Sequence, residues 1–266
     1  MFWNMFRSAG DSVRAYCEPF HEHLLEIVDD RHLIPEDPTH SGIEDYFAEY
    51  RHLDREVLGT LWKPWFGRER FMLERGDEAA DMEAYLRFLI DSSPQRPVLK
   101  FTRATFRVEW LREKFPDSTI VHLERRPRDI WTSMWGRDWN VEGETSGSFI
   151  PYTRSMAEDI GLDLPGDLYR TFYALMLLGN EMSEGVADDV WVYEEAVGNY
   201  TTWGTRHLIE AQLMEALPQI AIRSAVVPAD NHRGKWFDEQ EEAVRSMVGN
   251  SVKQFLVDGD LGTRAS

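Results

Sequence analysis

The sequence predicts an α/β fold built on a parallel β-sheet flanked by helices. Three short segments of β-branched and apolar residues are the candidate strands: 97–101 (PVLKF), 119–123 (TIVHL) and 190–193 (VWVY). Helical patterns separate these segments, and strands that alternate with helices form βαβ units, in which the strands run parallel. The 266 residues contain no internal repeat and no linker, so we expect a single domain over residues 1–266.

Helical patterns account for much of the remaining chain. The clearest covers residues 81–93, where acidic residues precede apolar residues at helical spacing. Another lies between the first two candidate strands and stops at Pro116. Residues 136–166 are rich in glycine and polar side chains with little periodicity, which is typical of a long functional loop. Further helices are expected at 2–9, 24–28, 43–75 (interrupted at Pro64) and 237–256.

The charge of the chain excludes two classes of partner. The formal net charge is −18 and the isoelectric point is about 4.8, and a surface of that sign repels nucleic acid and anionic membranes. Residues 96–137 differ, because ten Lys and Arg residues stand there against five acids, a net charge of +5. Such an island in an acidic chain favours an anionic small ligand, although chance clustering on a solvated helix face would give the same count.

Composition also indicates a compartment. Cys17 is the only cysteine, so an internal disulfide is impossible and a reducing cytoplasm is the natural location. No apolar run approaches the roughly 18 residues that a membrane-spanning helix requires, and the opening apolar stretch is too short for a signal peptide. We therefore expect a cytoplasmic protein that has neither a membrane nor a nucleic acid as its partner.

A phosphate site is expected within residues 122–135 (HLERRPRDIWTSMW). A candidate strand ends just before Arg125, and Pro127 suits the first turn of a helix, where its missing N–H costs nothing. The free N–H groups of that turn would lie beside Arg125, Arg126 and Arg128, which is how α/β folds bind phosphate at the carboxyl end of a strand. The alternative is a surface turn whose arginines pair with neighbouring acids.

The pattern R-x-P-x-D-x-x-x-S, present as Arg125, Pro127, Asp129 and Ser133, resembles the 3′-phosphate signature of the sulfotransferases that use 3′-phosphoadenosine 5′-phosphosulfate (PAPS). Four other segments resemble elements of that family in the same order: YCEPFHEHL, VLKFTRATFRVEWLREKFPDSTIVHL, VWVYEEAV and NHRGKWFDEQEEAV. The chain is similar to carbohydrate-type and bacterial members more than to cytosolic ones. The resemblance implies the three-layer, P-loop-like fold of this family.

The resemblance also implies which residues hold the 3′-phosphate. Arg125 and Ser133 would bind it through charge-assisted hydrogen bonds. Arg233, Gly234 and Lys235 would form the loop that closes over it; the alternative for these three residues is an ordinary basic turn before a helix.

A second set of residues would act at the other end of the donor. By resemblance, Lys100 lies near the 5′-phosphate and the transferring sulfuryl group, where it would offset charge that grows on the leaving oxygen. Arg103 would assist Lys100, unless it is only a helix-face arginine. Tyr193 would contact the adenosine, although a tyrosine at a strand end is as often part of the core.

Transfer to an acceptor hydroxyl requires a general base. Cytosolic members of the family place a histidine two residues after the strand lysine, but Thr102 stands there in this chain. Other branches use a glutamate, and Glu18 occupies that position; we expect its apolar neighbours to raise its pKa. His21 and His23 are the alternative bases. A metal site at His21-Glu22-His23 is rejected, because the zinc-helix spacing His-Glu-x-x-His is missing.

One element of the family has no counterpart in the sequence. Sulfotransferases begin with a central β-strand and an R-S-G-type loop that cradles the 5′-phosphosulfate, whereas the first pattern here is the helix over 2–9. We expect the N-terminal strand to be missing, which opens a gap in the sheet, and the chain as given to have little transferase activity. A kinase is disfavoured, since the chain shows no P-loop lysine.

The acceptor is expected to be a small molecule with a hydroxyl group, and the CEPF match favours a sugar. The alternative function is that of a non-catalytic relative that binds phosphoadenosine or a partner protein. An unpaired sheet position would also favour self-association into a homo-oligomer.

Overall fold

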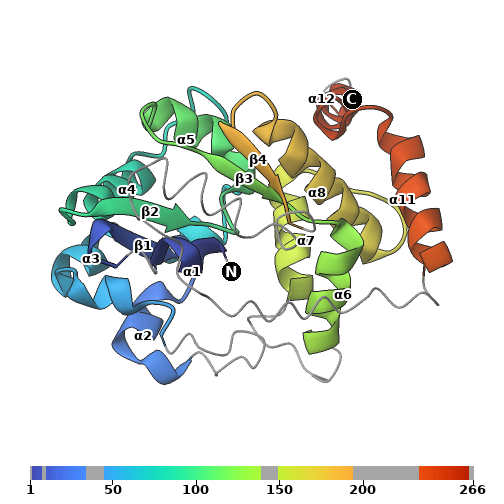
Figure 1. Ribbon diagram of the computed structural model, residues 1–266. Coiled ribbons are helices and arrows are strands. Elements are labelled where there is room, and N and C mark those ends of the chain that lie inside the picture. The colour runs from blue at the N-terminus through green and yellow to red at the C-terminus, as the bar shows by residue number, and fades with distance from the viewer. Residues whose placement is uncertain (1, 8–9, 34–44, 139–148, 194–233, 264–266) are drawn as a thin grey trace. The chain divides into compact units, whose positions relative to one another are not determined.

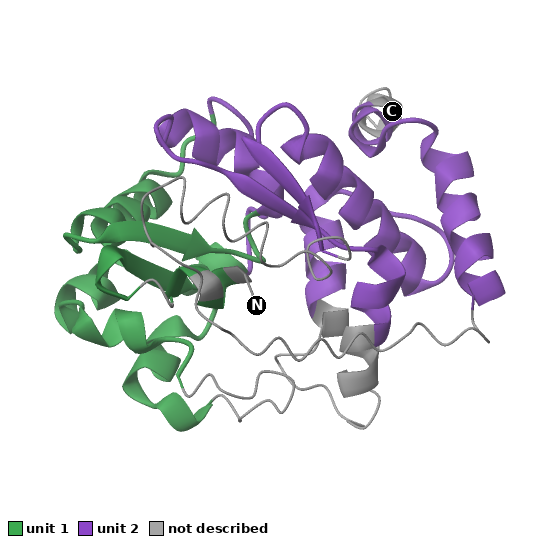
Figure 2. Ribbon diagram, viewed as in Figure 1, with its two compact units in different colours: residues 1–67, 77–104, 195–225 green, residues 68–76, 105–194, 226–266 purple. Residues whose placement is uncertain are grey.

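The computed structural model describes residues 2–7, 10–33, 45–138, 149–193 and 234–263. They form a mixed α/β structure with short pairs of parallel strands (Figure 1). The chain divides into two compact units, coloured separately in Figure 2. Unit 1 comprises residues 1–67, 77–104 and 195–225, and unit 2 comprises 68–76, 105–194 and 226–266. The expected single domain stays a prediction.

Unit 1 contains a two-stranded parallel sheet. β1 (Val13–Cys17) pairs with β2 (Arg96–Lys100), and the last residues of the two strands, Cys17 and Lys100, lie opposite each other. The other elements of unit 1 are helical: α1 (Phe2–Arg7), η1 (Gly10–Ser12), α2 (Leu24–Asp29), η2 (Arg31–Leu33), η4 (Ala48–His52), α3 (Arg55–Leu61), η5 (Pro64–Gly67) and α4 (Ala80–Asp91).

Aromatic side chains hold the strand β1 in place. The indole N–H of Trp3 donates a hydrogen bond to the carbonyl of Ala15 at 2.9 Å. At the end of the strand, the Tyr50 hydroxyl donates to the Cys17 carbonyl at 3.0 Å, and the Tyr85 hydroxyl donates to a carbonyl two residues further on, also at 3.0 Å. Each bond satisfies a buried carbonyl that would otherwise cost free energy, so the chain following β1 is held rigidly.

Unit 2 contains a second two-stranded parallel sheet. β3 (Val121–Glu124) pairs with β4 (Asp189–Val192), and Glu124 lies opposite Val192. Its other elements are η6 (Thr105–Arg107), α5 (Val108–Lys114), α6 (Pro127–Asp138), α7 (Phe149–Ile160), α8 (Leu168–Ser183), α11 (Gly234–Val248) and α12 (Val252–Thr263). Among the strands in the described ranges, no ladder joins β2 to β3.

The helix α8 is the centre of the unit 2 core. Asp167 caps it by accepting a hydrogen bond from the Tyr169 N–H at 2.9 Å. Ten of its sixteen residues are buried, and it packs against α6, α7, α11 and α12. A helix that is buried on most of its surface has to be surrounded by other elements, which explains why the helices of unit 2 gather around α8.

A buried arginine anchors the short segment of unit 2 at residues 68–76. Arg107 is fully buried, and its guanidinium donates to the carbonyls of Glu69 at 2.8 Å and Arg70 at 3.0 Å. From the other side, the Asp159 carboxylate accepts from the N–H groups of Arg70 at 3.1 Å and Phe71 at 2.6 Å. Arg70 has a φ of +51°, an unfavourable value for a side-chain-bearing residue. These bonds hold that turn in its strained conformation.

Several sequence predictions are confirmed. The strand candidates correspond to β2, β3 and β4 with shifts of one or two residues, and the pairs are parallel. The helix predicted at 81–93 is α4, which buries Met82, Tyr85 and Leu86 as its spacing indicates. The opening helix is α1. No helix among the described residues is long and apolar enough to cross a membrane.

Other predictions were wrong. The strand β1 was missed, although the turn sequence SAGDS directly precedes it. The long loop expected at 136–166 contains α7, whose inward residues Thr153, Met156 and Ala157 repeat at helical spacing. The closing helix at 237–256 is two helices, since Gly249 adopts a left-handed φ of +64° after α11.

We predict that Arg107→Met lowers the free energy of unfolding by about 2–4 kcal/mol, because two buried carbonyls lose their donors. Urea denaturation followed by circular dichroism measures the change. Arg154→Met is the matched control, since Arg154 is exposed on α7 and its loss should change stability by no more than about 0.5 kcal/mol. Equal effects of the two substitutions would contradict the assigned role of Arg107.

Candidate functional site

The sheet of unit 1 brings two predicted site residues together at the carboxyl ends of its strands. Lys100 is the last residue of β2, and Glu18 directly follows β1. The Glu18 N–H donates to the Lys100 carbonyl at 2.8 Å, which extends the pairing by one residue. Glu18 then turns with a φ of +47°. Such a backbone conformation costs free energy for a residue other than glycine, and it is found preferentially at functional sites.

The two oxygens of the Glu18 carboxylate have different partners. Oε1 forms an ion pair with the Lys100 ammonium group. Oε2 accepts a hydrogen bond from the Thr102 N–H at 3.0 Å and lies 3.6 Å from the Arg103 guanidinium. The side chain of Lys100 is 38% exposed, whereas that of Glu18 is 10% exposed. Lys100 is therefore the member of the pair that a dissolved ligand reaches first.

The predicted rise in the pKa of Glu18 is wrong. Burial does raise this pKa, but the charges of Lys100 and Arg103, and the hydrogen bonds from Lys100 and the Thr102 N–H, outweigh burial and lower the net pKa. The prediction considered only the apolar neighbours in the sequence. It did not include Lys100, the last residue of β2, or Arg103, which follows three residues later. In this structure Glu18 is an ionised, ion-paired carboxylate.

Arg103 is held by a second carboxylate. Its guanidinium lies 2.7 Å from Glu22, and the side chains are only 16% and 11% exposed. This pairing is not the arrangement expected of a residue that binds the donor, because the charge of Arg103 is already compensated within the protein. Arg103 is instead suited to orient Glu18.

His21 is a poor candidate for the general base. Burial, and then the nearby positive charge of Arg103, lower its pKa to about 4, so the ring is neutral at neutral pH. Its Nδ1 accepts a hydrogen bond from the His23 N–H at 3.2 Å, so the lone pair that would take a proton is engaged.

Gly67 lets η5 approach the loop that carries these residues. A Cβ atom at this position would lie 2.2 Å from the Phe20 carbonyl oxygen and 3.1 Å from the Glu22 N–H nitrogen. Neither of these backbone atoms can move without shifting the loop that follows Glu18. Only glycine fits this close approach.

In unit 2, the ends of β3 and β4 bring together Arg125 and Tyr193, which directly follow these strands. The Arg125 guanidinium lies over the Tyr193 ring at 4.8 Å from its centroid. Its Nε is buried and donates to no acceptor among the described residues. The helix α6 begins at Pro127, as predicted. Ser133 lies on α6, but its side chain is outside the described part of the structure.

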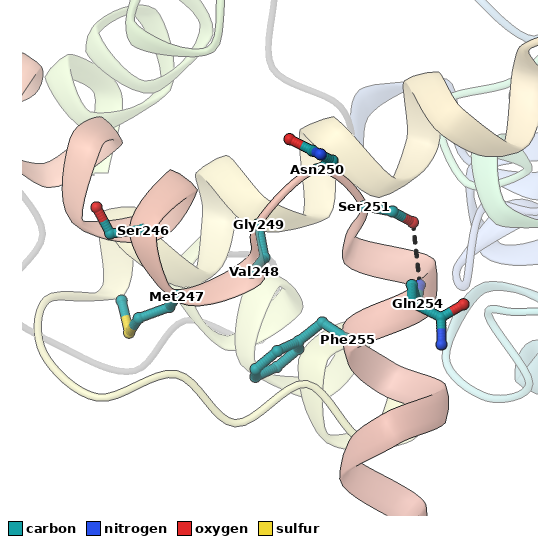
Figure 3. Close-up of a pocket in the computed structure, with 8 residues that line it drawn as sticks. All are labelled: Ser246, Met247, Val248, Gly249, Asn250, Ser251, Gln254 and Phe255. Atoms are coloured by element: carbon teal, nitrogen blue, oxygen red, sulfur yellow. Dashed lines mark hydrogen bonds between the residues drawn. The ribbon is translucent and has the colours of Figure 1, made fainter.

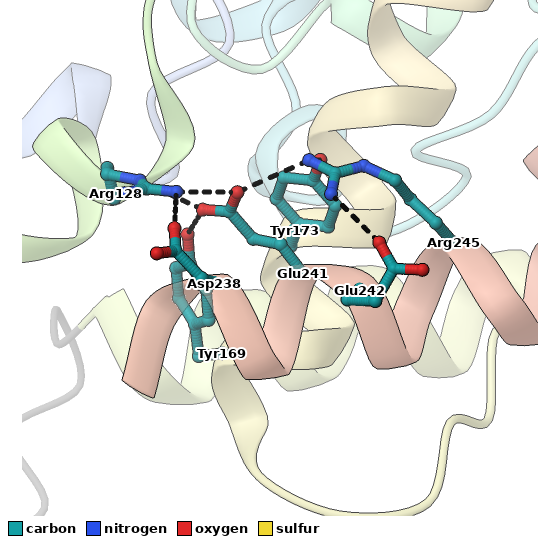
Figure 4. A network of polar contacts seen from close by, with 7 residues as sticks. All are labelled: Arg128, Tyr169, Tyr173, Asp238, Glu241, Glu242 and Arg245. Atoms are coloured by element: carbon teal, nitrogen blue, oxygen red, sulfur yellow. Dashed lines mark hydrogen bonds and ion pairs between the residues drawn. The ribbon is translucent and has the colours of Figure 1, made fainter. Parts of the chain in front are cut away.

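Arg128 links α6 to α11 (Figure 4). Its guanidinium donates to Glu241 at 3.1 and 2.8 Å and to Asp238 at 2.9 Å. Glu241 is buried and also accepts from the Tyr169 hydroxyl on α8 at 2.7 Å. Three helices therefore meet at one carboxylate. This arginine of the predicted phosphate site has a structural role, and its partners are on α11 and not the neighbouring acids of the alternative.

The partners of Arg128 lie in the second turn of α11, after the predicted residues Gly234 and Lys235. Gly234 and Lys235 belong to α11, so the prediction of a loop at these positions is wrong. Arg233 lies outside the described residues. The side chain of Lys235 is 90% exposed, and the carboxylate nearest to it, Glu239, is 3.7 Å away. Lys235 is therefore available to an anionic ligand from solution.

Five of the ten cations of the basic island, including Lys114 with Glu113, form ion pairs with carboxylates in the described structure. Arg112 forms an ion pair with Asp188, and Arg107 donates to carbonyls of the chain. Lys100, Arg103 and Arg128 have the carboxylate partners described above. Ion pairs within the fold therefore compensate part of the positive charge of this segment, and the anionic ligand stays a prediction.

A hollow of about 330 Å³ lies where α11 turns into α12 (Figure 3). It is lined by residues 246–251 together with Gln254 and Phe255. The N-terminus of α12 is already occupied there, since the Glu181 carboxylate accepts from the N–H groups of Val252 at 2.8 Å and Lys253 at 3.1 Å. The hollow is at the opposite end of α11 from Lys235 and contains no predicted site residue.

Comparison with known proteins finds no match among protein-family models, curated proteins or solved structures. The contacts described above are therefore the basis for a functional proposal.

We predict that Gly67→Ala destabilises unit 1 by roughly 3 kcal/mol, because the added methyl group overlaps the Phe20 carbonyl. Gly59→Ala is the control. Its Cβ meets only the flexible end of Arg55, and its position inside α3 should make alanine neutral or stabilising by up to about 1 kcal/mol. Urea denaturation compares the two variants; an equally mild effect of both would disprove the close approach at Gly67.

We also predict a pH dependence of stability that arises from His21. The pKa of His21 is about 4 in the folded protein, against about 6.5 in an unfolded chain. Between these values the unfolded chain binds the proton and the folded protein does not, so the free energy of unfolding decreases as the pH falls from about 6.5 towards 4. His21→Gln should flatten this slope in urea denaturation between pH 6.5 and 5. An unchanged slope would show that His21 is not buried as a neutral ring.

Proposed function

We propose that the protein is a PAPS-dependent sulfotransferase that transfers a sulfuryl group to a hydroxyl acceptor. The observation that carries the proposal is the pair Arg125 and Tyr193 at the ends of β3 and β4, where a partly buried guanidinium has an Nε without an acceptor in the described chain. A phosphate ester on a nucleotide would supply that acceptor, and the tyrosine ring offers an apolar surface to the adenosine.

The first turn of α6 supports a phosphate at this position. Pro127 has no N–H, and the N–H groups of Asp129 and Ile130 donate to the Arg126 carbonyl at 3.0 and 3.1 Å, so this turn contributes its partial positive charge next to Arg125. Lys235, in the first turn of α11, offers an exposed ammonium group. We assign the 3′-phosphate of PAPS to Arg125 and Lys235, with Ser133 and Arg233 as further ligands by resemblance.

Lys100 and Glu18 are the residues proposed to act in the sulfuryl transfer, Lys100 as the stabilising cation and Glu18 as the general base. The acceptor hydroxyl oxygen attacks the sulfur atom in line with the oxygen that bridges sulfur and the 5′-phosphate. An O–S bond forms as the bridging S–O bond breaks, and its electron pair stays on the phosphate oxygen, beside the Lys100 ammonium group. The hydroxyl proton passes to Glu18 and then to water. The products are a sulfate ester and adenosine 3′,5′-bisphosphate.

The arrangement of strands supports the family's fold for this chain. The resemblance predicts a parallel sheet, and the described strands pair in parallel. We therefore propose the three-layer sulfotransferase fold, in a cytoplasmic protein. A small hydroxyl compound, with a carbohydrate as first candidate, is the proposed acceptor.

The binding of adenosine 3′,5′-bisphosphate tests the proposal, because it requires no acceptor and no turnover. Isothermal titration calorimetry should detect binding to the full chain, and Arg125→Ala should weaken it by about 30- to 100-fold through the loss of a charge-assisted phosphate contact. Arg154→Ala, which removes an exposed arginine of α7, should bind like the unmodified protein.

Absence of binding to the unmodified chain would reject the nucleotide site. Transfer of the label from PAPS to any hydroxyl acceptor would exclude the non-catalytic relative.

A further inference from the structure

We propose that the donor itself activates Glu18, by displacing it from Lys100 when the anionic 5′ end of the nucleotide binds. This inference rests on the proposed function and adds a step to it. In the structure, Lys100 and Glu18 neutralise each other, so neither can play its part in the transfer while the ion pair persists. The two groups become active together only if a third, negatively charged group takes over the lysine.

The separate partners of the two carboxylate oxygens make such an exchange possible. Oε1 is bound by Lys100, whereas Oε2 is held by the Thr102 N–H at 3.0 Å and faces Arg103 at 3.6 Å. When Lys100 leaves, Oε1 is exposed as a proton acceptor and Oε2 keeps the carboxylate in place. The left-handed backbone of Glu18 and its buried surroundings limit its movement further.

The exposure of the pair determines which member moves. The Lys100 side chain is 38% exposed and has a long flexible stem, whereas the Glu18 side chain is 10% exposed. An anion from solution therefore meets the ammonium group and draws it away from the carboxylate. Glu22 keeps Arg103 in place at 2.7 Å during this exchange.

Loss of the lysine charge changes the proton affinity of Glu18. The charge of Lys100 is the largest of the effects that lower the pKa of Glu18, and burial alone raises this pKa. A bound anion that compensates Lys100 therefore lets the pKa rise, and the carboxylate becomes a stronger base when the donor is present. Without the donor, the pKa of Glu18 stays low, and the carboxylate is too weak a base to deprotonate the acceptor.

Several other titratable groups surround Glu18. The pKa of His21 is about 4 and that of Cys17 about 12, and the pKa values of Tyr50 and Lys100 are raised from already high values. The remaining charged or titratable neighbours are Arg103, Glu22, His23 and Glu49, and burial raises the pKa of Glu49. The proton uptake that depends on Glu18 is therefore the difference between the unmodified chain and Glu18→Gln, because both proteins contain these neighbours.

The test compares two nucleotides on the full chain by calorimetry: adenosine 3′,5′-bisphosphate, which has a 5′-phosphate, and adenosine 3′-phosphate, which has none. Glu18→Gln removes the competitor for Lys100, so it should tighten binding of the bisphosphate on the order of tenfold and leave binding of the monophosphate unchanged. Glu49→Gln is the matched control. Glu49 is as buried as Glu18, at 8% exposure, but pairs with Arg7 instead of Lys100.

A second measurement, of proton uptake on binding, distinguishes the displacement of Glu18 from Lys100 from the mere loss of a negative charge in Glu18→Gln. Titrations near pH 5.5 in buffers of different ionisation enthalpy give the number of protons taken up on binding. The unmodified chain should take up more protons than Glu18→Gln with the bisphosphate, and equally many with the monophosphate. The comparison isolates Glu18, since the phosphates of the nucleotide titrate in both proteins.

Each outcome decides one of the two proposals. If both nucleotides bind but Glu18→Gln changes neither the affinity nor the proton uptake, the exchange is refuted and the proposed function stands. An equal gain in affinity with Glu49→Gln also refutes the exchange. If neither nucleotide binds to the unmodified chain, the proposed function fails, and the exchange fails with it.

Discussion

The parallel pairing of strands in register is the constraint on which the candidate site depends. Strands that run in the same direction end at the same edge of a sheet, so residues that directly follow them become neighbours. In unit 1 this brings Glu18 to Lys100, and in unit 2 it brings Arg125 to Tyr193. Each pair places a cation in contact with a second side chain: Lys100 with the Glu18 carboxylate, and Arg125 with the Tyr193 ring. A shift of either strand by one residue would reverse the direction of the side chains and separate the pairs.

The distribution of charge explains how so acidic a chain carries a local excess of arginine and lysine. Much of the basic island serves to fasten elements together: Arg107 holds a strained turn, and Arg128 joins α6 to α11 through Glu241. A buried cation such as Arg107 requires partners, because an unpaired charge in the interior costs several kcal/mol. Arg125 and Lys235 differ, because the Arg125 Nε has no acceptor among the described residues and the Lys235 side chain is 90% exposed.

At Glu18, a strained backbone conformation and close packing occur at a residue that we propose to act in the transfer. A left-handed glutamate is unfavourable by itself, and it persists because the Lys100 carbonyl, the Thr102 N–H and the close approach of Gly67 leave it little alternative. Burial raises the pKa of this carboxylate, but the charges of Lys100 and Arg103 and the hydrogen bonds from Lys100 and the Thr102 N–H outweigh it and lower the net pKa. Glu18 is thus ionised and engaged by Lys100, which is the starting state of the proposed exchange.

The sequence by itself determined the class of fold, three of the four described strands, the face of α4 and the start of α6 at Pro127, because apolar periodicity and proline act over a few residues. It also identified the residues that the strand ends bring together. Only the tertiary structure revealed the short strand β1 and α7, and only it decided that Glu18 meets a lysine 82 residues away and is ionised. The reason is physical: proton affinity and ion pairing depend on which distant groups the strand register places within a few ångströms, and no local pattern of residues contains that information.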